Sequence, residues 1–160
     1  MRSQVAQTLS QFSNRKGRVA EQAALSQLRV LLVEDHKPFL DYVSSSLRER
    51  PSTQIVSEVS DGLVAVEQAT ALQPDLILLD IGLPGLNGIQ AARRIRKLAP
   101  NARIIFLTQE SSPEIVHEAL NLGASAFVSK SRCFKDLPAA IDAVLRGEIF
   151  VSNGLDGHRM

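Results

Sequence analysis

The sequence predicts an α/β fold, a doubly wound parallel sheet of five strands in the order 2-1-3-4-5 with helices on both faces. Two observations predict it. Between residues 29 and 150, short apolar runs rich in branched side chains alternate with longer segments of helical apolar spacing. Right-handed crossovers and short connections leave few topologies for such an alternation, and this order is the simplest of them.

Five strands are predicted from apolar runs that are too short for helices. The first run, Val30 to Val33, has no polar interruption, which suits a strand buried on both faces of the sheet. The same pattern then repeats along the chain. In chain order the predicted strands are residues 29–33, 54–59, 75–79, 103–107 and 126–129.

Five helices are predicted after these strands, where apolar residues recur at helical spacing. Pro51 stops the first helix, and Asp61 is a natural N-cap residue for the second. Ser111 or Ser112 is expected to cap the fourth helix before Pro113, which suits a first-turn position. In chain order the predicted helices are residues 37–50, 62–72, 89–98, 113–122 and 135–146.

Composition divides the chain into three parts. Residues 1–28 are rich in Gln, Ser and Ala, and residues 1–29 carry five basic side chains against one acid, Glu21, a local charge of +4. We expect this extension to be flexible or marginally helical. The alternatives are a short amphipathic helix that docks on a partner or on the domain, and an organelle transit peptide. Residues 29–150 form the predicted domain, and residues 151–160 form a C-terminal tail.

The whole composition is that of an ordinary globular protein. The 160 residues suffice for one domain with a real core, and 44% of them are apolar and 22% charged. No apolar run approaches the roughly 18 residues of a membrane span. The single cysteine, Cys133, excludes an internal disulfide and a Cys-based zinc site, and we interpret it as a packing residue. A reducing compartment, and hence the cytoplasm, is the expected location.

Polar side chains stand at the carboxyl ends of four predicted strands. Glu34 and Asp35 follow the first strand, Asp80 the third, Thr108 the fourth and Lys130 the fifth. The predicted order has its switch point between the first and third strands, so the acids fall where this fold class binds its ligands. Taken singly, each residue is more often a cap, turn or surface residue. Taken together, they predict one shared phosphoryl-transfer pocket.

Four segments in chain order carry a resemblance to a known family. They are VLLVEDH at 30–36, LILLDIGLPGLNG at 76–88, IIFLT at 104–108 and GASAFVSKS at 123–131. Over about residues 29–150 the sequence resembles the receiver domain of the response regulators of two-component systems. The first and last segments, and LRGEIFVS at 145–152, are most similar to receivers of LuxR-type (NarL/FixJ-like) regulators. The resemblance implies a flavodoxin-like fold and a role in phosphorelay signal transduction.

The resemblance also implies a phosphoacceptor. Asp80 would attack the phosphorus of a phosphohistidine on a sensor histidine kinase or a histidine phosphotransfer protein and become an aspartyl phosphate. The implied cofactor is Mg²⁺, because a hard divalent cation offsets the repulsion between a carboxylate and phosphoryl oxygens. Its implied ligands are Asp35, Asp80 and the backbone carbonyl of Gly82, with Glu34 acting through water.

Two further residues would serve the phosphoryl group and the switch that follows. Lys130 would supply positive charge to the phosphoryl oxygens, and the Thr108 hydroxyl would donate a hydrogen bond to one of them. In this family the Thr then moves toward the phosphoryl group and an aromatic side chain, here Phe127, turns inward. Phe lacks a hydroxyl, so its role would be packing only. The surface formed by residues 112–146 would report the switch.

The sequence departs from the family at the site entrance. Gln109 stands where a small residue is most common, which would restrict the access of phosphodonors. Gly82 and Glu110 occupy the positions that tune the lifetime of the phosphoryl group, and an ordinary lifetime is expected. We interpret His36 as a first-turn residue of the helix rather than a metal ligand, and Tyr42 as a helix surface residue.

Two other readings stay open. A pseudo-receiver would use the same fold as a constitutive protein-interaction module, which Gln109 makes conceivable and the intact Asp80, Thr108 and Lys130 disfavour. An independent enzyme, such as an aspartyl-phosphate phosphatase, would need a second acid two residues after its nucleophile, where Gly82 stands. The chain is therefore expected to catalyse only its own phosphorylation and dephosphorylation.

The output of the predicted receiver depends on other polypeptides. A LuxR-type regulator continues into a DNA-binding domain, and this sequence shows no helix-turn-helix pattern. We therefore expect no DNA binding by this chain itself, because the scattered cations of its extension would give weak nonspecific attraction at most. The alternatives are a piece of a transcription factor and a standalone receiver that acts on a protein target. A homodimer through residues 112–146 is compatible with the family.

Overall fold

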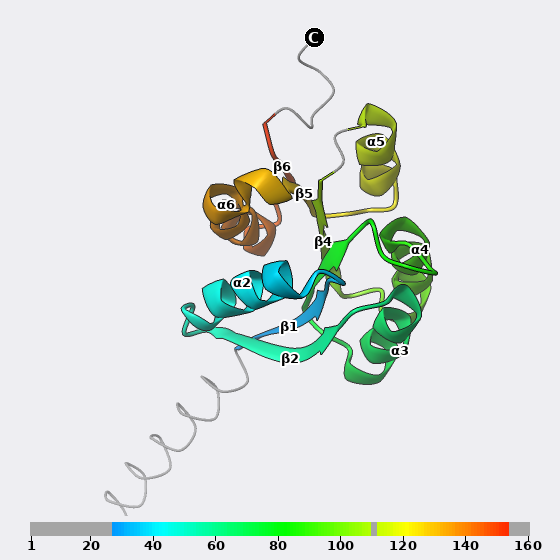
Figure 1. The fold of residues 1–160 in the computed structure, drawn as a ribbon, viewed down its shortest axis with the longest axis horizontal. Coiled ribbons are helices and arrows are strands. Elements are labelled where there is room, and N and C mark those ends of the chain that lie inside the picture. The colour runs from blue at the N-terminus through cyan, green and yellow to red at the C-terminus, as the bar shows by residue number, and fades with distance from the viewer. Residues whose placement is uncertain (1–26, 110–111, 154–160) are drawn as a thin grey trace, which may run out of the picture.

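The computed structural model describes residues 27–109 and 112–153 and confirms the predicted fold (Figure 1). The sheet is parallel throughout, in the order β2-β1-β3-β4-β5-β6. The strands are β1 Leu28–Val33, β2 Thr53–Val59, β3 Leu76–Asp80, β4 Arg103–Thr108, β5 Ala126–Ser129 and β6 Phe150–Val151. The predictions made for residues 1–26, Glu110, Ser111 and residues 154–160 lie outside the described residues.

Five helices connect the strands of the described chain. They are α2 Lys37–Arg48, α3 Gly62–Leu72, α4 Gly88–Leu98, α5 Pro113–Asn121 and α6 Cys133–Leu145, with a short 3-10 helix, η1 Lys130–Arg132, before α6. Figure 1 shows α2 and α6 on one side of the sheet and α3, α4 and α5 on the other. The doubly wound arrangement therefore covers both faces of the sheet, as the uninterrupted apolar strands require.

The core consists of two layers, one on each face of the sheet. Successive strand residues alternate between them: Leu31 and Val33 pack with α3, α4 and α5, whereas Val30 and Leu32 pack with α2 and α6. This alternation follows from the two-residue period of a strand. Because both layers are apolar, β1, β3 and β4 have little freedom to slip in register, and their carboxyl ends stay aligned.

The structure corrects several predicted boundaries. Helix α2 ends at Arg48, two residues early, because the residue before Pro51 avoids the helical region and the Arg50 amide instead closes a turn on the Leu47 carbonyl, at 3.0 Å. Helix α6 begins at Cys133 rather than at residue 135. A sixth short strand, β6, pairs with β5 after a turn at Gly147, and two residues are too few to give a periodic signal.

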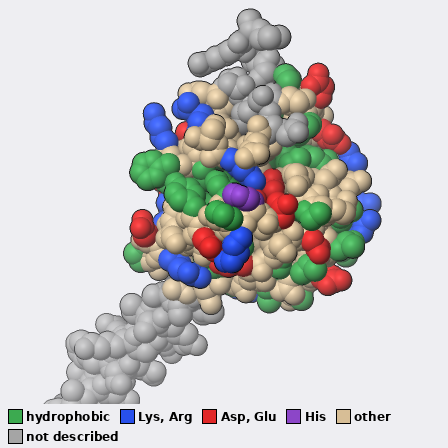
Figure 2. All heavy atoms as spheres, in the orientation of Figure 1, with side chains coloured by type: hydrophobic (Ala, Val, Ile, Leu, Met, Phe, Trp, Pro, Cys, Tyr) green, Lys and Arg blue, Asp and Glu red, His purple; other side chains and the backbone are tan. Residues whose placement is uncertain are grey.

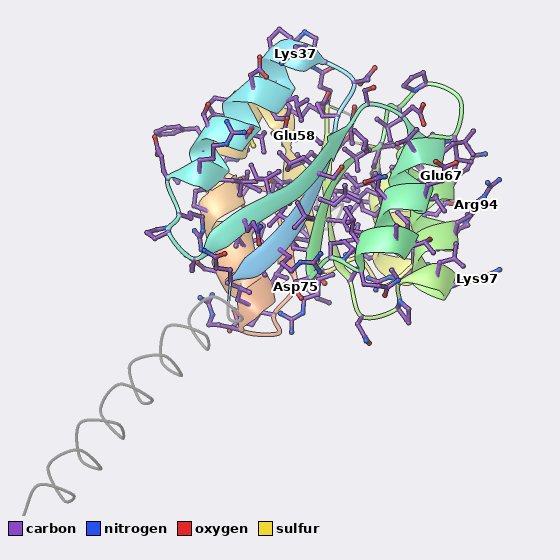
Figure 3. All side chains as sticks on the ribbon, turned by 90° about the horizontal axis from the view of Figure 1, so that it is seen from below. Lys37, Glu58, Glu67, Asp75, Arg94 and Lys97 are labelled. Atoms are coloured by element: carbon purple, nitrogen blue, oxygen red, sulfur yellow. The ribbon has the colours of Figure 1, made fainter. Side chains whose placement is uncertain are left out.

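One of the two predicted N-caps forms the expected hydrogen bond. Asp61 is the N-cap residue of α3, and its side chain accepts from the Val64 amide at 2.8 Å, as predicted. Ser112 occupies the N-cap position of α5 without a capping hydrogen bond. Figure 3 shows Glu67, Arg94 and Lys97 projecting outward from α3 and α4, so these charges cover the helices without entering the core.

The turn after β3 is folded tightly against the strand. The Gly88 amide donates to the Ile81 carbonyl at 2.9 Å, and a Cβ atom at Gly88 would lie 2.2 Å from the carbonyl oxygen of Asp80. Such contact is impossible for any other residue without a shift of the backbone. Asn87 and Gln90 form a capping box that starts α4 at this point. The turn therefore lies in close contact with the backbone of Asp80.

Candidate functional site

The topology brings the predicted site residues to one edge of the sheet. Asp80 is the last residue of β3 and pairs with Leu107 of β4, while Thr108 is the last residue of β4 and pairs with Ser129 of β5. Lys130 directly follows β5. Glu34 follows β1, the strand beside β3. The residues come together because parallel strands end at the same edge.

Three carboxylates form an acidic cluster at this edge. Glu34, Asp35 and Asp80 each offer an oxygen, and these oxygens all lie within 4.8 Å of one another. Asp35 is exposed, whereas Glu34 and Asp80 are 3% and 4% exposed. Two buried carboxylates so close together repel each other and must be offset by positive charge.

Lys130 supplies part of that charge. Its Nζ donates to Oε1 of Glu34 at 2.9 Å and lies 3.3 Å from Oδ2 of Asp80. The ammonium also stands over the ring of Phe39 in α2, 4.9 Å from the ring centroid. A cation over an aromatic face is stabilised by the ring quadrupole, so Phe39 supports Lys130 from outside the acidic cluster.

The charge on Asp80 remains disfavoured despite Lys130. Burial, and then the nearby Glu34 carboxylate, raise the pKa of Asp80 from 3.8 to about 6. Lys130 and the Gly82 amide, which donates to Oδ1 at 3.1 Å, act in the opposite direction but do not cancel the effect. The site therefore has an excess of negative charge over what its own groups neutralise.

The donor set fits a hard divalent cation. Oε2 of Glu34 is buried and makes no hydrogen bond among the described residues, although the Lys130 ammonium lies 2.8 Å away. The other oxygen, Oε1, accepts from both Lys130 and the His36 amide. Three carboxylates in one cluster, one of them exposed to solvent, are the oxygen ligands that Mg²⁺ takes while keeping several waters.

A pocket of about 800 Å³ opens above the cluster. Thr108 is buried at its floor, and Gly82 and the exposed Gln109 line it. The sequence did not predict that Phe39 and Tyr42 of α2 would line it as well. The available signal was that Phe39 and Tyr42, three residues apart, share one face of the helix that directly follows Glu34 and Asp35.

The remaining predicted residues lie around the pocket. His36 lines it and is the N-cap residue of α2, outside the helix rather than in its first turn. Phe127 is fully buried, with its ring centroid 6.0 Å from that of Phe106. Cys133 is buried, and burial raises the pKa of its thiol to about 12, which agrees with a packing role.

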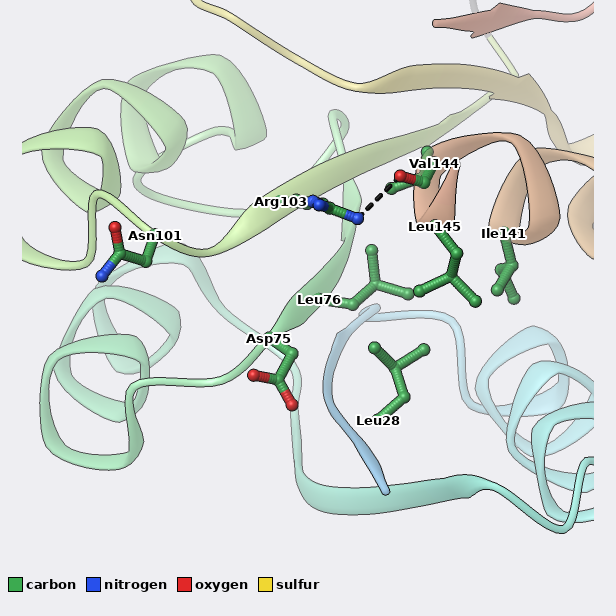
Figure 4. A pocket seen from close by; sticks show the side chains of 8 residues that line it. All are labelled: Leu28, Asp75, Leu76, Asn101, Arg103, Ile141, Val144 and Leu145. Carbon is green, nitrogen blue, oxygen red and sulfur yellow. Dashed lines mark hydrogen bonds between the residues drawn. The ribbon is translucent and has the colours of Figure 1, made fainter. Parts of the chain in front are cut away.

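A second pocket, of about 260 Å³, lies near the opposite edge of the sheet (Figure 4). Its wall includes the apolar side chains of Leu28 and Leu76. The Arg103 guanidinium beside it donates to the Val144 carbonyl at 2.7 Å, and Asp75 accepts from the Arg29 amide at 2.9 Å. These charges are engaged with backbone groups that hold the amino ends of the strands, so we assign this pocket a structural role.

Known proteins share both the sequence pattern and the fold of this chain. Residues 30–142 match the family described as the response regulator receiver domain. The chain is 32% identical over 126 residues to the nitrate/nitrite response regulator protein NarL of Escherichia coli, with 79% of this chain and 58% of the relative covered. It is 31% identical over 121 residues to the response regulator protein VraR of Staphylococcus aureus, with 76% and 58% covered. The chain thus spans about three fifths of these relatives.

Solved structures show the same likeness. A LuxR-family two-component response regulator from Aurantimonas sp. SI85-9A1 has a TM-score of 0.77 and 32% identity, with 82% of this chain and 94% of that chain covered. The isolated receiver domain of RcsB from Salmonella enterica, solved with the phosphomimetic BeF3-, has a TM-score of 0.76 and 25% identity, with 82% and 97% covered. Among the described residues, no helix combines the length and apolarity that would let it cross a bilayer.

Proposed function

The chain belongs to the response regulator receiver domain family, and from this premise we propose that Asp80 accepts a phosphoryl group from a phosphohistidine. The donor would be a sensor histidine kinase or a histidine phosphotransfer protein. The observation that carries the proposal is the setting of Asp80, a buried carboxylate at the end of a strand, 3.3 Å from a lysine ammonium and within 4.8 Å of two other acids.

The reaction needs no separate general base, because a carboxylate is already a nucleophile. An oxygen of Asp80 forms a bond to phosphorus as the phosphorus–nitrogen bond of the donor breaks and imidazole leaves with the electron pair. Lys130, which now faces Glu34 and Asp80, holds positive charge where the phosphoryl oxygens would arrive. The Thr108 hydroxyl would donate to one of these oxygens.

We assign Mg²⁺ to the acidic cluster as cofactor. Asp35, Asp80 and the backbone carbonyl of Gly82 would hold it, and Glu34, whose Oε1 is engaged by Lys130 and the His36 amide, would contribute through water. When bound, the cation offsets the repulsion between the Asp80 carboxylate and the phosphoryl oxygens.

Phosphorylation would be read through the coupling of Thr108 to Phe127. Thr108 ends β4, and Phe127 lies in β5 beside Phe106 of β4. Because Phe127 is already buried, the change would be a repacking inside the core when Thr108 moves toward the phosphoryl group. Residues 112–146, which comprise α5, β5, η1 and α6, would carry that change to the surface.

Three positions would set how long the phosphoryl group lasts. Gly82 leaves space for an attacking water, since even a Cβ atom there would be 3.9 Å from Oδ1 of Asp80. Gln109 lines the pocket and would narrow the path of a phosphodonor. Glu110 would orient the water or repel small anionic donors. A lifetime of ordinary length follows from this combination.

The output would pass to another polypeptide or to a DNA-binding output domain. One structure of the similar RcsB is described as a complex with DNA, and the present chain covers 66% of that protein. On the face in Figure 2, the described side chains of both charge signs are mixed with hydrophobic ones, so the described residues of this face form no continuous basic surface for nucleic acid. We propose that the described domain does not itself bind DNA and that it signals through residues 112–146, with or without dimerisation.

One observation favours a second function, that of a pseudo-receiver. The exposed Gln109 lies at the mouth of the pocket, where its side chain would hinder the approach of a donor. A chain that is never phosphorylated would use the same surface as a constitutive interaction module. The buried charges of Asp80, Glu34 and Lys130 weigh against this reading, because a purely structural module has no need to bury them.

Intact mass spectrometry separates the two functions. The protein is incubated at neutral pH with Mg²⁺ and phosphoramidate or acetyl phosphate, and in parallel with EDTA. A receiver gains about 80 Da from one phosphoryl group in the presence of Mg²⁺, and neither the EDTA sample nor Asp80→Ala gains it. No gain with either small donor or with a phosphorylated kinase would favour the pseudo-receiver, and Gln109→Ala would then show whether access is the obstacle.

A further inference from the structure

A buried serine near the end of the described chain contacts the segment that carries Lys130, residues 129–132. Ser152 follows β6 and is 0% exposed, and its amide donates to the Phe127 carbonyl at 2.9 Å. Its hydroxyl oxygen lies 3.1 Å from the amide nitrogen of Ser129, the residue before Lys130. The same oxygen lies 2.7 Å from Oδ2 of Asp136 in α6. Three segments of the chain therefore meet at one hydroxyl.

The chemistry of the partners sets the direction of both hydrogen bonds. An amide N–H can only donate and an ionised carboxylate can only accept, so the Ser152 hydroxyl accepts from Ser129 and donates to Asp136. A hydroxyl has one proton and two lone pairs, which lets both bonds exist together. The bond to Asp136 orients the hydroxyl so that a lone pair faces the Ser129 amide.

Asp136 also binds the last residue of η1, Arg132. Its Oδ2 accepts from Nε of Arg132 at 3.1 Å, and the residue is 6% exposed. The segment of residues 129–132 is thus anchored one residue before Lys130 and two residues after it. We call the set of Ser152, Asp136 and Arg132 the clasp.

A structural role alone accounts for part of the clasp. An acid in the first turn of α6 is stabilised by the positive end of the helix dipole, which explains the position of Asp136. The helix dipole does not explain why Ser152, which lies beyond the helix, is fully buried and accepts a hydrogen bond from the Ser129 amide. Burial of a hydroxyl and a carboxylate is unfavourable unless each is hydrogen-bonded, so the arrangement depends on all of its members.

We propose that Ser152 and Asp136 are positioning residues for Lys130. They hold the backbone of residues 129–132 in place, and Lys130 then reaches Glu34 and Asp80 with its Nζ. The proposal rests on the proposed function, since it assigns Lys130 to the phosphoryl group. It also means that the segment after α6 is hydrogen-bonded to the residues that position Lys130. A displacement of β6 would break these bonds and leave Lys130 less well ordered.

The test compares Ser152→Ala with a matched variant, Ser44→Ala. Ser44 is also buried and donates to a carboxylate oxygen, Oε1 of Glu58, at the same distance of 2.7 Å, but it lies between α2 and β2. Both variants lose a charge-assisted hydrogen bond to an acid, and Ser152→Ala also loses the bond from the Ser129 amide, so Ser152→Ala should be the more destabilised of the two. Ser44→Ala therefore controls for the loss of a buried hydroxyl that is bonded to an acid. Phosphorylation by phosphoramidate with Mg²⁺ and hydrogen exchange of the Ser129 amide are measured in both.

We expect Ser152→Ala to be phosphorylated about tenfold more slowly at saturating phosphoramidate, with an exchange of the Ser129 amide about tenfold faster, as the loss of one hydrogen bond allows. Ser44→Ala should match the wild type in both. Asp136→Asn keeps an accepting oxygen and loses the charge, so its phosphorylation and amide exchange rates should lie between those of the wild type and Ser152→Ala. If Ser152→Ala does not fold, Asp136→Asn replaces it in the test. An unchanged rate in Ser152→Ala, or an equal slowing in Ser44→Ala, would overturn the proposal.

The experiment distinguishes failure of the proposed function from failure of the claim that the clasp positions Lys130. If the wild type takes up no phosphoryl group, the function fails, and the clasp is judged by amide exchange and by the NMR shifts of the Lys130 side chain in Mg²⁺-free protein. Shifts that change in Ser152→Ala and not in Ser44→Ala support positioning of Lys130. Shifts that stay unchanged in both overturn it.

Discussion

Asp80 carries its charge where burial and a neighbouring acid oppose it. Its pKa is raised to about 6 by desolvation and by Glu34. In the unfolded chain the group returns to its ordinary value near 3.8, so the folded protein binds the proton more tightly. The contribution of Asp80 to the free energy of unfolding is therefore largest at low pH. This contribution is lost as the pH rises from about 4 to about 6.

The first prediction follows from this sign. In EDTA at pH 7.5, Asp80→Asn should be more stable than the wild type by about 1 to 3 kcal/mol, the upper value being the full pKa difference. At pH 4 the wild-type group is protonated in the folded state, and the difference should shrink toward zero. Urea denaturation at both pH values measures the free energy of unfolding.

Asp41→Asn is the control for that measurement, because Asp41 forms an exposed pair with Lys37 and should change stability little. Mg²⁺ should stabilise the wild type and not Asp80→Asn, since a ligand that binds the folded state alone raises its stability. A wild type that is the more stable at pH 7.5 in EDTA would show that the charge of Asp80 is well compensated.

Lys130 supports the second prediction. It lowers the pKa of Asp80, so Lys130→Gln should raise that pKa above its value of about 6. The same change should slow phosphorylation about 100-fold, because one donor to the developing charge is lost. A carboxyl carbon NMR titration in EDTA follows the pKa, and mass spectrometry follows the rate. Lys97→Gln, a charge change on the outer face of α4, should leave both unchanged; an equal effect there would indicate a general loss of charge.

At the scale of elements, the turn between β3 and α4 sets the position of the acceptor. A Cβ atom at Gly88 would approach the Asp80 carbonyl oxygen to 2.2 Å, so Gly88→Ala should push the strand end away. We expect a loss of about 2 to 4 kcal/mol in the free energy of unfolding and weaker Mg²⁺ binding, measured by denaturation and by titration calorimetry.

Gly85→Ala is the matched comparison in the same turn. Gly85 has a φ of +69° and open space around its Cβ position, so only the backbone conformation opposes the change. We expect Gly85→Ala to lower the free energy of unfolding by about 1 kcal/mol and to leave Mg²⁺ binding normal. If Gly85→Ala impaired Mg²⁺ binding as much as Gly88→Ala, general loosening of the turn rather than contact with Asp80 would be the cause.

Element types were predictable from local patterns, whereas some element ends were not. Helix α3 was predicted at its observed bounds because Asp61 marks its start and apolar residues recur along it as far as Leu72. The start of α6 at Cys133 was missed because no capping side chain marks it. Strand β6 depends on its contacts with β5, which lie more than 20 residues away in sequence. Local patterns carry no signal for such pairing.

Across the whole molecule, the sequence predicted which residues meet at the sheet edge but not how they pair. The convergence of Glu34, Asp80 and Lys130 follows from strand order alone. The ion pair between Lys130 and Glu34 joins residues 96 positions apart, and the bond from Ser152 to Asp136 needs β6 in place. Phe39 was missed for the same reason, since its contact with Lys130 depends on how α2 packs against the sheet.

The central claim is that Asp80, among three clustered acids, receives the phosphoryl group. After incubation with phosphoramidate and Mg²⁺, borohydride reduction converts an aspartyl phosphate to homoserine, which lowers the mass of the residue by about 14 Da. Peptide mapping then assigns the site. We predict that this mass loss occurs at Asp80 and requires Mg²⁺. Reduction at Asp35 or Glu34 in place of Asp80, or an unmodified Asp80 peptide from protein that has gained a phosphoryl group, would contradict the account.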